Sequence, residues 1–146
     1  MAFSIFQYKS TKISAEHSND IKNKLNAIYH YLPKTKQERF WFILLSISAG
    51  ICEEIIFRLF LFEFCREHTM LGFAFIIPNI IFALTHIGSG ISNLIIAFIL
   101  GLLFSVIYYF TQNIWLAVLL HIAIDINTGL LAYNVEQIQK QSNIPL

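Results

Sequence analysis

The sequence predicts an all-α membrane protein, a polytopic bundle of about four transmembrane helices with an amphipathic helix at the N-terminus. Of the 146 residues, 56% are hydrophobic and only 13% are charged, and the mean hydropathy is +0.61. A water-soluble domain of this length cannot bury so much apolar surface. The apolar runs are continuous and do not alternate with polar residues, which argues against a β-barrel. The net charge of +1 argues against a nucleic-acid partner.

Residues 1–33 are predicted to form a polar segment followed by an amphipathic helix on the membrane surface. The first half of this region is polar and has no clear period. From Ser18 onward, apolar residues recur at helical spacing, and Lys22 and Lys24 lie elsewhere on the helical wheel. The same pattern also fits a short helix that packs on the membrane core.

The predicted membrane core covers residues 34–134. Thr35 and Glu38 have the spacing of a capping box, which starts the first long helix at about Lys36. This helix continues through Phe64 and is long enough to cross about 30 Å of hydrocarbon.

Three further apolar stretches follow the first, each close to the roughly 20 residues that a membrane span requires. Their connections are short, so consecutive spans are expected to be antiparallel neighbours. The C-terminal tail is expected to be residues 135–146. The three stretches lie near residues 69–87, 91–110 and 114–133.

Basic residues precede the first span, whereas the loop after it offers Arg66 alone as a strong positive charge. Because positively charged flanks stay on the cytoplasmic side, we expect the N-terminus in the cytoplasm and the protein in the plasma (inner) membrane. The basic residues that precede the span are Lys22, Lys24, Lys34, Lys36 and Arg39.

Two adjacent glutamates, Glu53 and Glu54, lie inside the first apolar helix together with Arg58. An acidic residue near the middle of a spanning helix is unfavourable by about 2.5 to 3.5 kcal/mol, so the pair needs partners or a wet cavity. Glu54 and Arg58 share a helix face, which predicts an ion pair and leaves Glu53, rotated by about 100°, free to point elsewhere. A salt bridge that only holds helices together would explain one glutamate but not both.

Two histidines occupy later spans, each one helical turn from a second candidate residue. His86 follows Phe82 by one turn, and His121 precedes Asp125 by one turn. A single histidine in an apolar helix is more often a satisfied core residue than a ligand. Carboxylates and imidazoles from three spans can instead converge on one polar cavity, where a carboxylate acts as general base toward water. The imidazoles would then bind a metal or stabilise an oxyanion.

Depth in the membrane is consistent for two of these residues and less so for the third. Glu53 lies roughly 20 Å from the cytoplasmic end of its helix and His121 roughly 12 Å from the opposite face, so the two are nearly level. His86 would lie close to the cytoplasmic surface. That conflict eases if residues 63–72 project beyond the bilayer, or if Pro78 kinks the helix.

These motifs resemble those of the CAAX-protease and bacteriocin-processing family of membrane proteins, which includes the Ras-converting enzyme. Their order and spacing also agree, over about residues 33–127. The family's E-E-x-x-x-R motif is matched by Glu53, Glu54 and Arg58, its F-x-x-x-H motif by Phe82 and His86, and its H-x-x-x-N or H-x-x-x-D motif by His121 and Asp125.

The resemblance implies an intramembrane endopeptidase that cuts a membrane-bound or lipid-modified protein or peptide. In that reading Glu53, assisted by Glu54, activates the water and His86 helps to hold it. His121 and Asp125 stabilise the oxyanion. In an alternative metalloprotease reading, a zinc ion is held by ligands drawn from His86, His121, Asp125 and Glu53. Arg58 and Phe82 would be structural partners.

Two features depart from the family pattern. Its members commonly have six to eight spans, so a chain with about four is either a minimal core or one that needs a homo-oligomer or another membrane partner. Asp125 stands where many members have asparagine, and the added negative charge favours a metal. Two other functions stay open: a non-catalytic bacteriocin-immunity or scaffold protein of the same fold, and a small proton or cation carrier.

Overall fold

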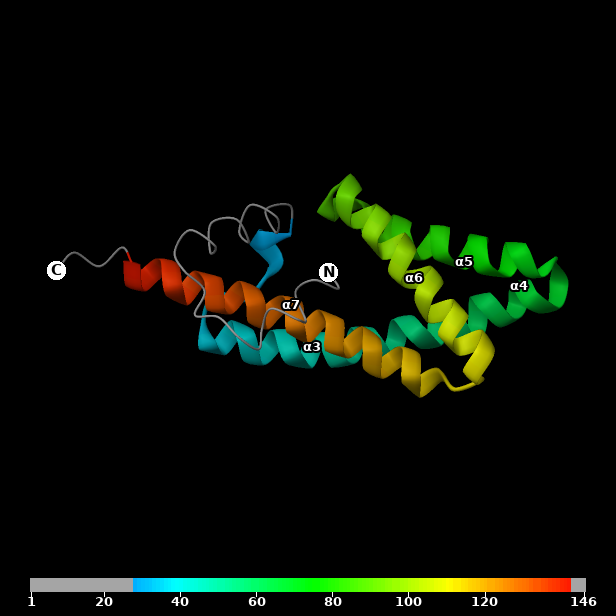
Figure 1. The fold of residues 1–146 in the computed structure, drawn as a ribbon, viewed down its shortest axis with the longest axis horizontal. Coiled ribbons are helices and arrows are strands. Elements are labelled where there is room, and N and C mark those ends of the chain that lie inside the picture. The colour runs from blue at the N-terminus through cyan, green and yellow to red at the C-terminus, as the bar shows by residue number, and fades with distance from the viewer. Residues whose placement is uncertain (1–27, 143–146) are drawn as a thin grey trace. The chain divides into compact units, whose positions relative to one another are not determined.

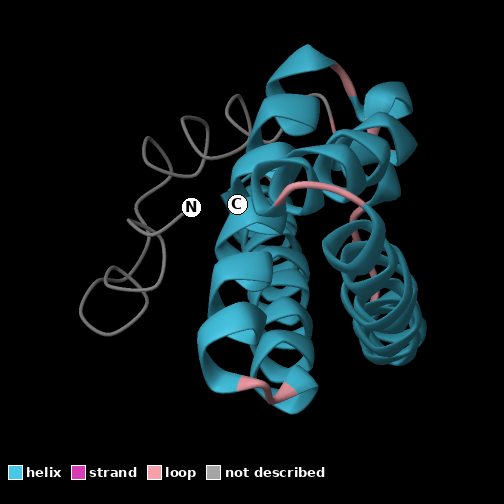
Figure 2. Cartoon of the chain, turned by 90° about the vertical axis from the view of Figure 1, so that its right-hand side faces the viewer, coloured by secondary structure: helices cyan, strands magenta, loops and turns pink. Residues whose placement is uncertain are grey.

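The computed structural model describes residues 28–142, and every regular element within them is helical (Figure 1, Figure 2). The all-α prediction is therefore confirmed for this part of the chain. The polar segment and most of the amphipathic helix predicted for residues 1–33 lie outside the described residues. The elements are η1 (Tyr29–Tyr31), α3 (Lys36–Glu54), η2 (Ile55–Phe62), α4 (Glu63–His68), α5 (Leu71–Thr85), η3 (Ile87–Ser89), α6 (Ile91–Thr111) and α7 (Ile114–Ser142).

The chain divides into two compact units. One is Leu44–Ile124 and contains most of the helices, and the other combines the residues up to Ile43 with those from Asp125 onward. Helices α3 and α7 each contribute to both units because the boundaries fall inside them.

Three helical segments are long and apolar enough to cross a membrane: Lys36–His68, Ile91–Thr111 and Ile114–Lys140. The remaining predicted span forms α5, which has only 15 residues. A helix of that length is about 22 Å long, shorter than the hydrocarbon layer. Its ends are set by Met70, which is extended before the helix, and by His86, which caps it.

The first long helix is continuous but not uniform. Its middle section, Ile55–Phe62, is a π-helix, in which backbone bonds run from one residue to the fifth along. Arg58 and Phe62 are buried within this section. π-Helices are rare, and the single-turn π-bulges that occur inside α-helices are frequently found at functional sites. The apolar pattern of the sequence predicted an ordinary helix here.

The core of the unit Leu44–Ile124 consists of two apolar clusters that join η2 and α4 to α5 and α6. Figure 1 shows α5 and α6 lying side by side, and their packing accounts for much of each cluster. Outward-facing side chains of these helices are largely apolar and exposed, as expected for surfaces in contact with lipid. The buried members of the clusters are Phe57, Phe82, Ala83 and Ala97 in the first and Phe62, Cys65, Ala74 and Tyr108 in the second.

The second unit pairs the start of α3 with the end of α7. The predicted capping interaction is present, because the Glu38 backbone N–H donates to Thr35 Oγ1 at 3.1 Å. Tyr29 donates its hydroxyl to Glu136 Oε2 at 2.6 Å. The α7 helix continues to Ser142, past the predicted end of the span near residue 133. Burial, followed by the hydrogen bond and the negative charge of Glu136, raises the pKa of the Tyr29 hydroxyl.

Candidate functional site

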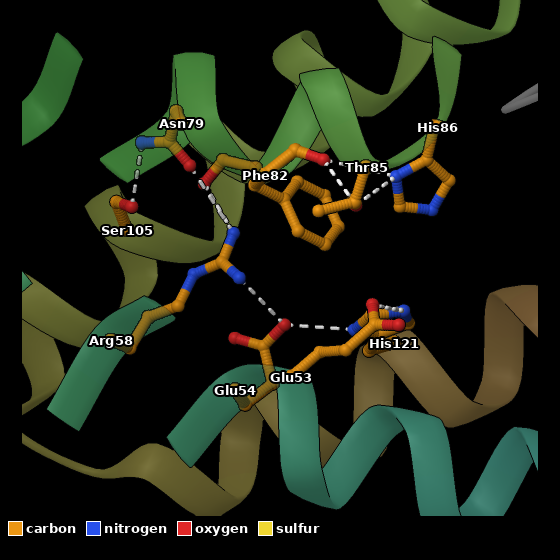
Figure 3. A network of polar contacts seen from close by, with 10 residues as sticks. Glu53, Glu54, Arg58, Asn79, Phe82, Thr85, His86, Ser105 and His121 are labelled. Carbon is orange, nitrogen blue, oxygen red and sulfur yellow. Dashed lines mark hydrogen bonds and ion pairs between the residues drawn. The ribbon is translucent and has the colours of Figure 1, made fainter. Parts of the chain in front are cut away.

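The two adjacent glutamates have different surroundings, as the sequence predicted. Glu54 Oε1 lies 3.0 Å from Arg58 Nη1, and both side chains are fully buried. The Glu53 side chain is 31% exposed and points away from this ion pair (Figure 3). The predicted ion pair between Glu54 and Arg58 is therefore confirmed, and Glu53 retains access to the surroundings.

Arg58 contacts groups from both α5 and α6. Its Nη2 donates to Asn79 Oδ1 at 3.3 Å and to the carbonyl of Gly101 at 2.9 Å. The guanidinium also lies over two phenyl rings, with Cζ 5.0 Å from the centroid of Phe82 and 5.4 Å from that of Phe104. Hydrogen bonds and cation–π contacts thus replace water around a charge inside an apolar bundle.

The sequence interpretation missed two members of this network, Asn79 in α5 and Ser105 in α6. Both side chains are fully buried. The Asn79 amide Nδ2 donates to Ser105 Oγ at 2.9 Å and to the carbonyl of Phe75 at 2.7 Å. A signal was available, since both are polar residues in otherwise apolar helices, but their partners could not be read from spacing along the chain.

His121 lies between the two glutamates. Its Nδ1 is 2.8 Å from Glu54 Oε1, and its Nε2 is 3.7 Å from Glu53 Oε2. An ionised carboxylate only accepts hydrogen bonds, so Nδ1 carries the proton that it shares with Glu54. The ring stacks on Phe104, with centroids 5.3 Å apart. Glu54 therefore fixes the imidazole through Nδ1, and Glu53 faces Nε2.

His86 caps the C-terminus of α5, and its Nδ1 lies 3.0 Å from the carbonyl of Phe82. Because a carbonyl only accepts, this nitrogen carries a proton and Nε2 is the remaining acceptor of the neutral ring. The Phe82 ring borders both histidines, with centroids 4.9 Å from His86 and 6.1 Å from His121. Phe82 is thus a packing partner of both imidazoles and of the Arg58 guanidinium.

Asp125 lies on α7, one turn after His121, but belongs to the other compact unit. Within residues 28–142, no three His, Cys, Asp or Glu side chains gather closely enough to hold a metal ion. As arranged, the described residues do not form a zinc site, and zinc binding stays a prediction.

The polar centre of the unit Leu44–Ile124 combines a partly exposed carboxylate, a fixed imidazole and a buried ion pair inside apolar helices. Groups of these kinds, kept together inside apolar helices, can act as acids and bases toward a water molecule. Figure 3 shows its residues coming from four stretches of helix: the end of α3 with η2, then α5, α6 and α7.

The model of the family "Type II CAAX prenyl endopeptidase Rce1-like" matches residues 35–127. The chain belongs to this family, and it is an integral membrane protein. It is also 32% identical, over 83 residues, to a Bacillus subtilis (strain 168) protein named "Putative membrane peptidase YdiL". That alignment covers 57% of this chain and 33% of the relative, so the chain spans about a third of the relative's length. No solved structure matches the chain.

Proposed function

We propose that the chain is an intramembrane endopeptidase that hydrolyses a peptide bond with a water molecule activated by Glu53. The observation that carries the proposal is the His121 ring held between two carboxylates, at 2.8 Å from Glu54 and 3.7 Å from Glu53. The family match and the name of the Bacillus relative support the same activity. The substrate is a membrane-bound or lipid-modified protein or peptide, because the outer faces of the helices are apolar.

The two glutamates divide the work in this proposal. Glu54 is committed to Arg58 and His121 and has no access to the surroundings. Glu53 is partly exposed, and its buried Oε2 has no hydrogen-bond partner among the described residues. A carboxylate with an unused acceptor atom is suited to bind and deprotonate a water molecule. Glu53 is therefore the general base.

His121 assists the proton transfer. The 3.7 Å between His121 Nε2 and Glu53 Oε2 is too long for a hydrogen bond and suits a bridging water. Glu53 takes one proton as the water oxygen bonds to the carbonyl carbon, and the amide nitrogen receives a proton as the C–N bond breaks. If His121 Nε2 carries a proton on its way to the amide nitrogen, the ring becomes an imidazolium. Glu54 would stabilise this charge, as the carboxylate does in a hydrolase triad. An oxyanion role for His121 also requires this protonated ring.

His86 is the second candidate for holding the water. Its Nδ1 is engaged by the Phe82 carbonyl, so Nε2 of the neutral ring is available as an acceptor. The ring is half-buried and packs against Phe82, whose ring also lies near His121. A role of Asp125 in binding the oxyanion stays a prediction, and no catalytic step here depends on it.

The proposed location is the plasma membrane, with the N-terminus in the cytoplasm. Lys34, Lys36 and Arg39 all precede or begin the first apolar helix, which is the distribution expected of a cytoplasmic flank. Reporter fusions to the N-terminus that are active only in the cytoplasm would test the orientation. Activity of a reporter that works only outside the cytoplasm would contradict it.

The proposed activity is tested by comparing protein termini in membrane fractions of cells that produce the wild type or Glu53→Gln. This substitution keeps the size of the side chain and removes the base. Glu67→Gln is the matched control, because Glu67 is exposed at the end of α4. We expect at least one new terminus with the wild type and the control that is absent with Glu53→Gln.

Identical termini in all three strains, at equal levels of inserted protein, would contradict the proposed activity and favour a non-catalytic scaffold or immunity role. Uptake of protons or cations into sealed vesicles that depends on Glu53 would instead favour a carrier. This measurement separates the carrier from the scaffold or immunity protein, because only a carrier is expected to move protons or cations as purified protein.

A further inference from the structure

We propose that Asn79, supported by Ser105, is a positioning residue that holds the Arg58 guanidinium so that Glu54 keeps the His121 ring in place. This inference rests on the proposed function, since it assigns a role in the same reaction. Asn79 itself contacts neither the water nor the substrate in that proposal. It acts through a chain of hydrogen bonds that Figure 3 shows from Ser105 to His121.

The hydrogen-bonding capacity of Arg58 explains why Asn79 matters. Nη1 donates to Glu54 Oε1 at 3.0 Å, and the two hydrogens of Nη2 are taken by Asn79 Oδ1 at 3.3 Å and the Gly101 carbonyl at 2.9 Å. The Gly101 carbonyl is part of the α6 backbone and cannot be removed by a side-chain change. Asn79 is the one uncharged side chain that accepts a hydrogen bond from this guanidinium among the described residues.

The orientation of the Asn79 amide is determined by its own partners. Its Nδ2 lies 2.7 Å from the Phe75 carbonyl, which can only accept, so the NH2 group must be on that side. The second hydrogen of Nδ2 is directed to Ser105 Oγ at 2.9 Å. The Oδ1 atom therefore faces Arg58. Ser105 and the Phe75 carbonyl together fix the acceptor that holds the guanidinium.

The effect reaches the reacting groups through one shared atom. Glu54 Oε1 accepts hydrogen bonds from both Arg58 Nη1 and His121 Nδ1. A guanidinium that rotates after losing Asn79 would displace this oxygen and with it the His121 ring. Because a displacement of about 1 Å in a catalytic group can reduce turnover by about a hundredfold, Asn79 should affect turnover and not substrate binding.

The hold on Arg58 can be measured directly by NMR of the guanidinium groups in protein that carries 15N-labelled arginine. The full chain is reconstituted in lipid nanodiscs. It has three arginines, and Arg39 and Arg66 are internal references because neither side chain is buried. Arg58→Lys assigns the signal. A firmly held guanidinium exchanges its N–H protons slowly and gives separate Nη resonances.

Two substitutions of Asn79 separate positioning from packing. Asn79→Leu has similar size and removes the acceptor, whereas Asn79→Asp keeps an oxygen toward Arg58. A positioning role predicts that the Arg58 N–H protons still exchange slowly in Asn79→Asp and exchange rapidly in Asn79→Leu. A packing role predicts the reverse order, because a leucine suits an apolar interior better than a carboxyl group. Ser105→Ala, which removes one acceptor of the Asn79 amide, should accelerate exchange of the Arg58 N–H protons by a smaller factor.

Asn93→Leu is the matched control. The Asn93 amide makes the same kind of bond, to the carbonyl of Ser89 four residues earlier at 2.7 Å, but it is not among the partners of Arg58. We expect wild-type Arg58 signals in this variant. Slow Arg58 signals that persist in Asn79→Leu, or rapid exchange already present in the wild type, would overturn the inference.

The catalytic consequence is measured with a peptide that spans a junction cut in a Glu53-dependent manner. For Asn79→Leu we expect kcat to fall on the order of tenfold and KM to stay within about twofold, with partial recovery in Asn79→Asp. If Asn79→Leu cleaves the peptide with an unchanged kcat, the positioning role of Asn79 is contradicted but the proposed function is not. The absence of any Glu53-dependent cleavage contradicts the proposed function, while the NMR measurement still decides whether Asn79 holds Arg58.

Discussion

Glu54 accepts a hydrogen bond from Nδ1 of His121 at 2.8 Å, which joins the end of α3 to α7 inside the larger unit. The same carboxylate oxygen accepts from Arg58. Glu54 is thus enclosed by two donors, whereas its neighbour Glu53 has one longer contact at 3.7 Å. Adjacent glutamates with such different surroundings should respond differently to the same substitution.

Replacing Glu54 by glutamine should destabilise the protein much more than the same change at Glu53. Glu54→Gln leaves the buried Arg58 charge without its counter-ion, which should lower the free energy of unfolding by about 3 kcal/mol. Glu53→Gln should cost less than about 1 kcal/mol, because its side chain is partly exposed and its contact is long. Reversible unfolding by SDS in mixed micelles measures both. Equal losses at the two positions would contradict the division of roles.

Gly101 should not tolerate even a methyl group. A Cβ atom there would lie 2.5 Å from Asn79 Oδ1 and 3.0 Å from Phe82 Cδ1. Asn79 cannot move aside, because three hydrogen bonds hold its amide. We expect Gly101→Ala to lower the free energy of unfolding by about 2 kcal/mol and to reduce turnover.

The matched control for Gly101 is Gly72→Ala in the first turn of α5. A Cβ at Gly72 would meet nothing within 4 Å. Because alanine is the better helix former, this change should be neutral or stabilising by up to about 1 kcal/mol. If Gly72→Ala lowered the free energy of unfolding more than Gly101→Ala, close packing of α6 against α5 would not be the reason for glycine at position 101.

The sequence was sufficient to predict the ion pair of Glu54 and Arg58. Residues four apart share a face of a helix, and an apolar helix must compensate a buried charge locally. The motifs also named both histidines, of which His121 contacts the two glutamates. The ion pair follows from the spacing of residues within one helix, and the two histidines follow from the family pattern.

Contacts between helices could not be predicted in the same way. Asn79 and Ser105 are 26 residues apart and meet only because α5 packs on α6. The apolar period indicates which faces are buried but does not give the rotation of one helix against another. The π-helical section Ile55–Phe62 was missed because its residues have the same apolar character as those of an ordinary spanning helix. The 15-residue length of α5 depends on the backbone at Met70 and His86.

Tyr29 should anchor the short helix η1 to α7 in the smaller unit. Its hydroxyl donates to Glu136 at 2.6 Å, so Tyr29→Phe should weaken this attachment by about 1 kcal/mol. Hydrogen exchange of the backbone amides of Tyr31 and Leu32, which bond within this turn, measures the effect. Tyr31→Phe is the control, because the Tyr31 side chain is 66% exposed.

The Tyr29 contribution has a defined pH dependence. Burial and the adjacent Glu136 raise the pKa of the hydroxyl above its ordinary value of about 10. A raised pKa means that the protonated form is favoured by folding, so the stabilisation is fully present below pH 10 and is lost only as the pH rises through the higher folded value. The difference between wild type and Tyr29→Phe should therefore be the same at pH 7 and pH 9. A difference that disappears between these two values would contradict the hydrogen bond.

Removal of metal ions should leave the proposed peptidase active. Within residues 28–142 no three potential ligands gather, and Glu54, which lies beside His121, is already engaged by Arg58. We expect cleavage by purified protein to survive dialysis against a chelator, with less than one zinc ion per chain by elemental analysis. Asp125→Asn should also retain activity, because the family pattern accepts asparagine at this position. Activity that is lost on chelation and restored by Zn²⁺, together with inactivity of Asp125→Asn, would contradict the water-and-glutamate mechanism. That result would mean that His86, His121 and Asp125 move together around a metal ion.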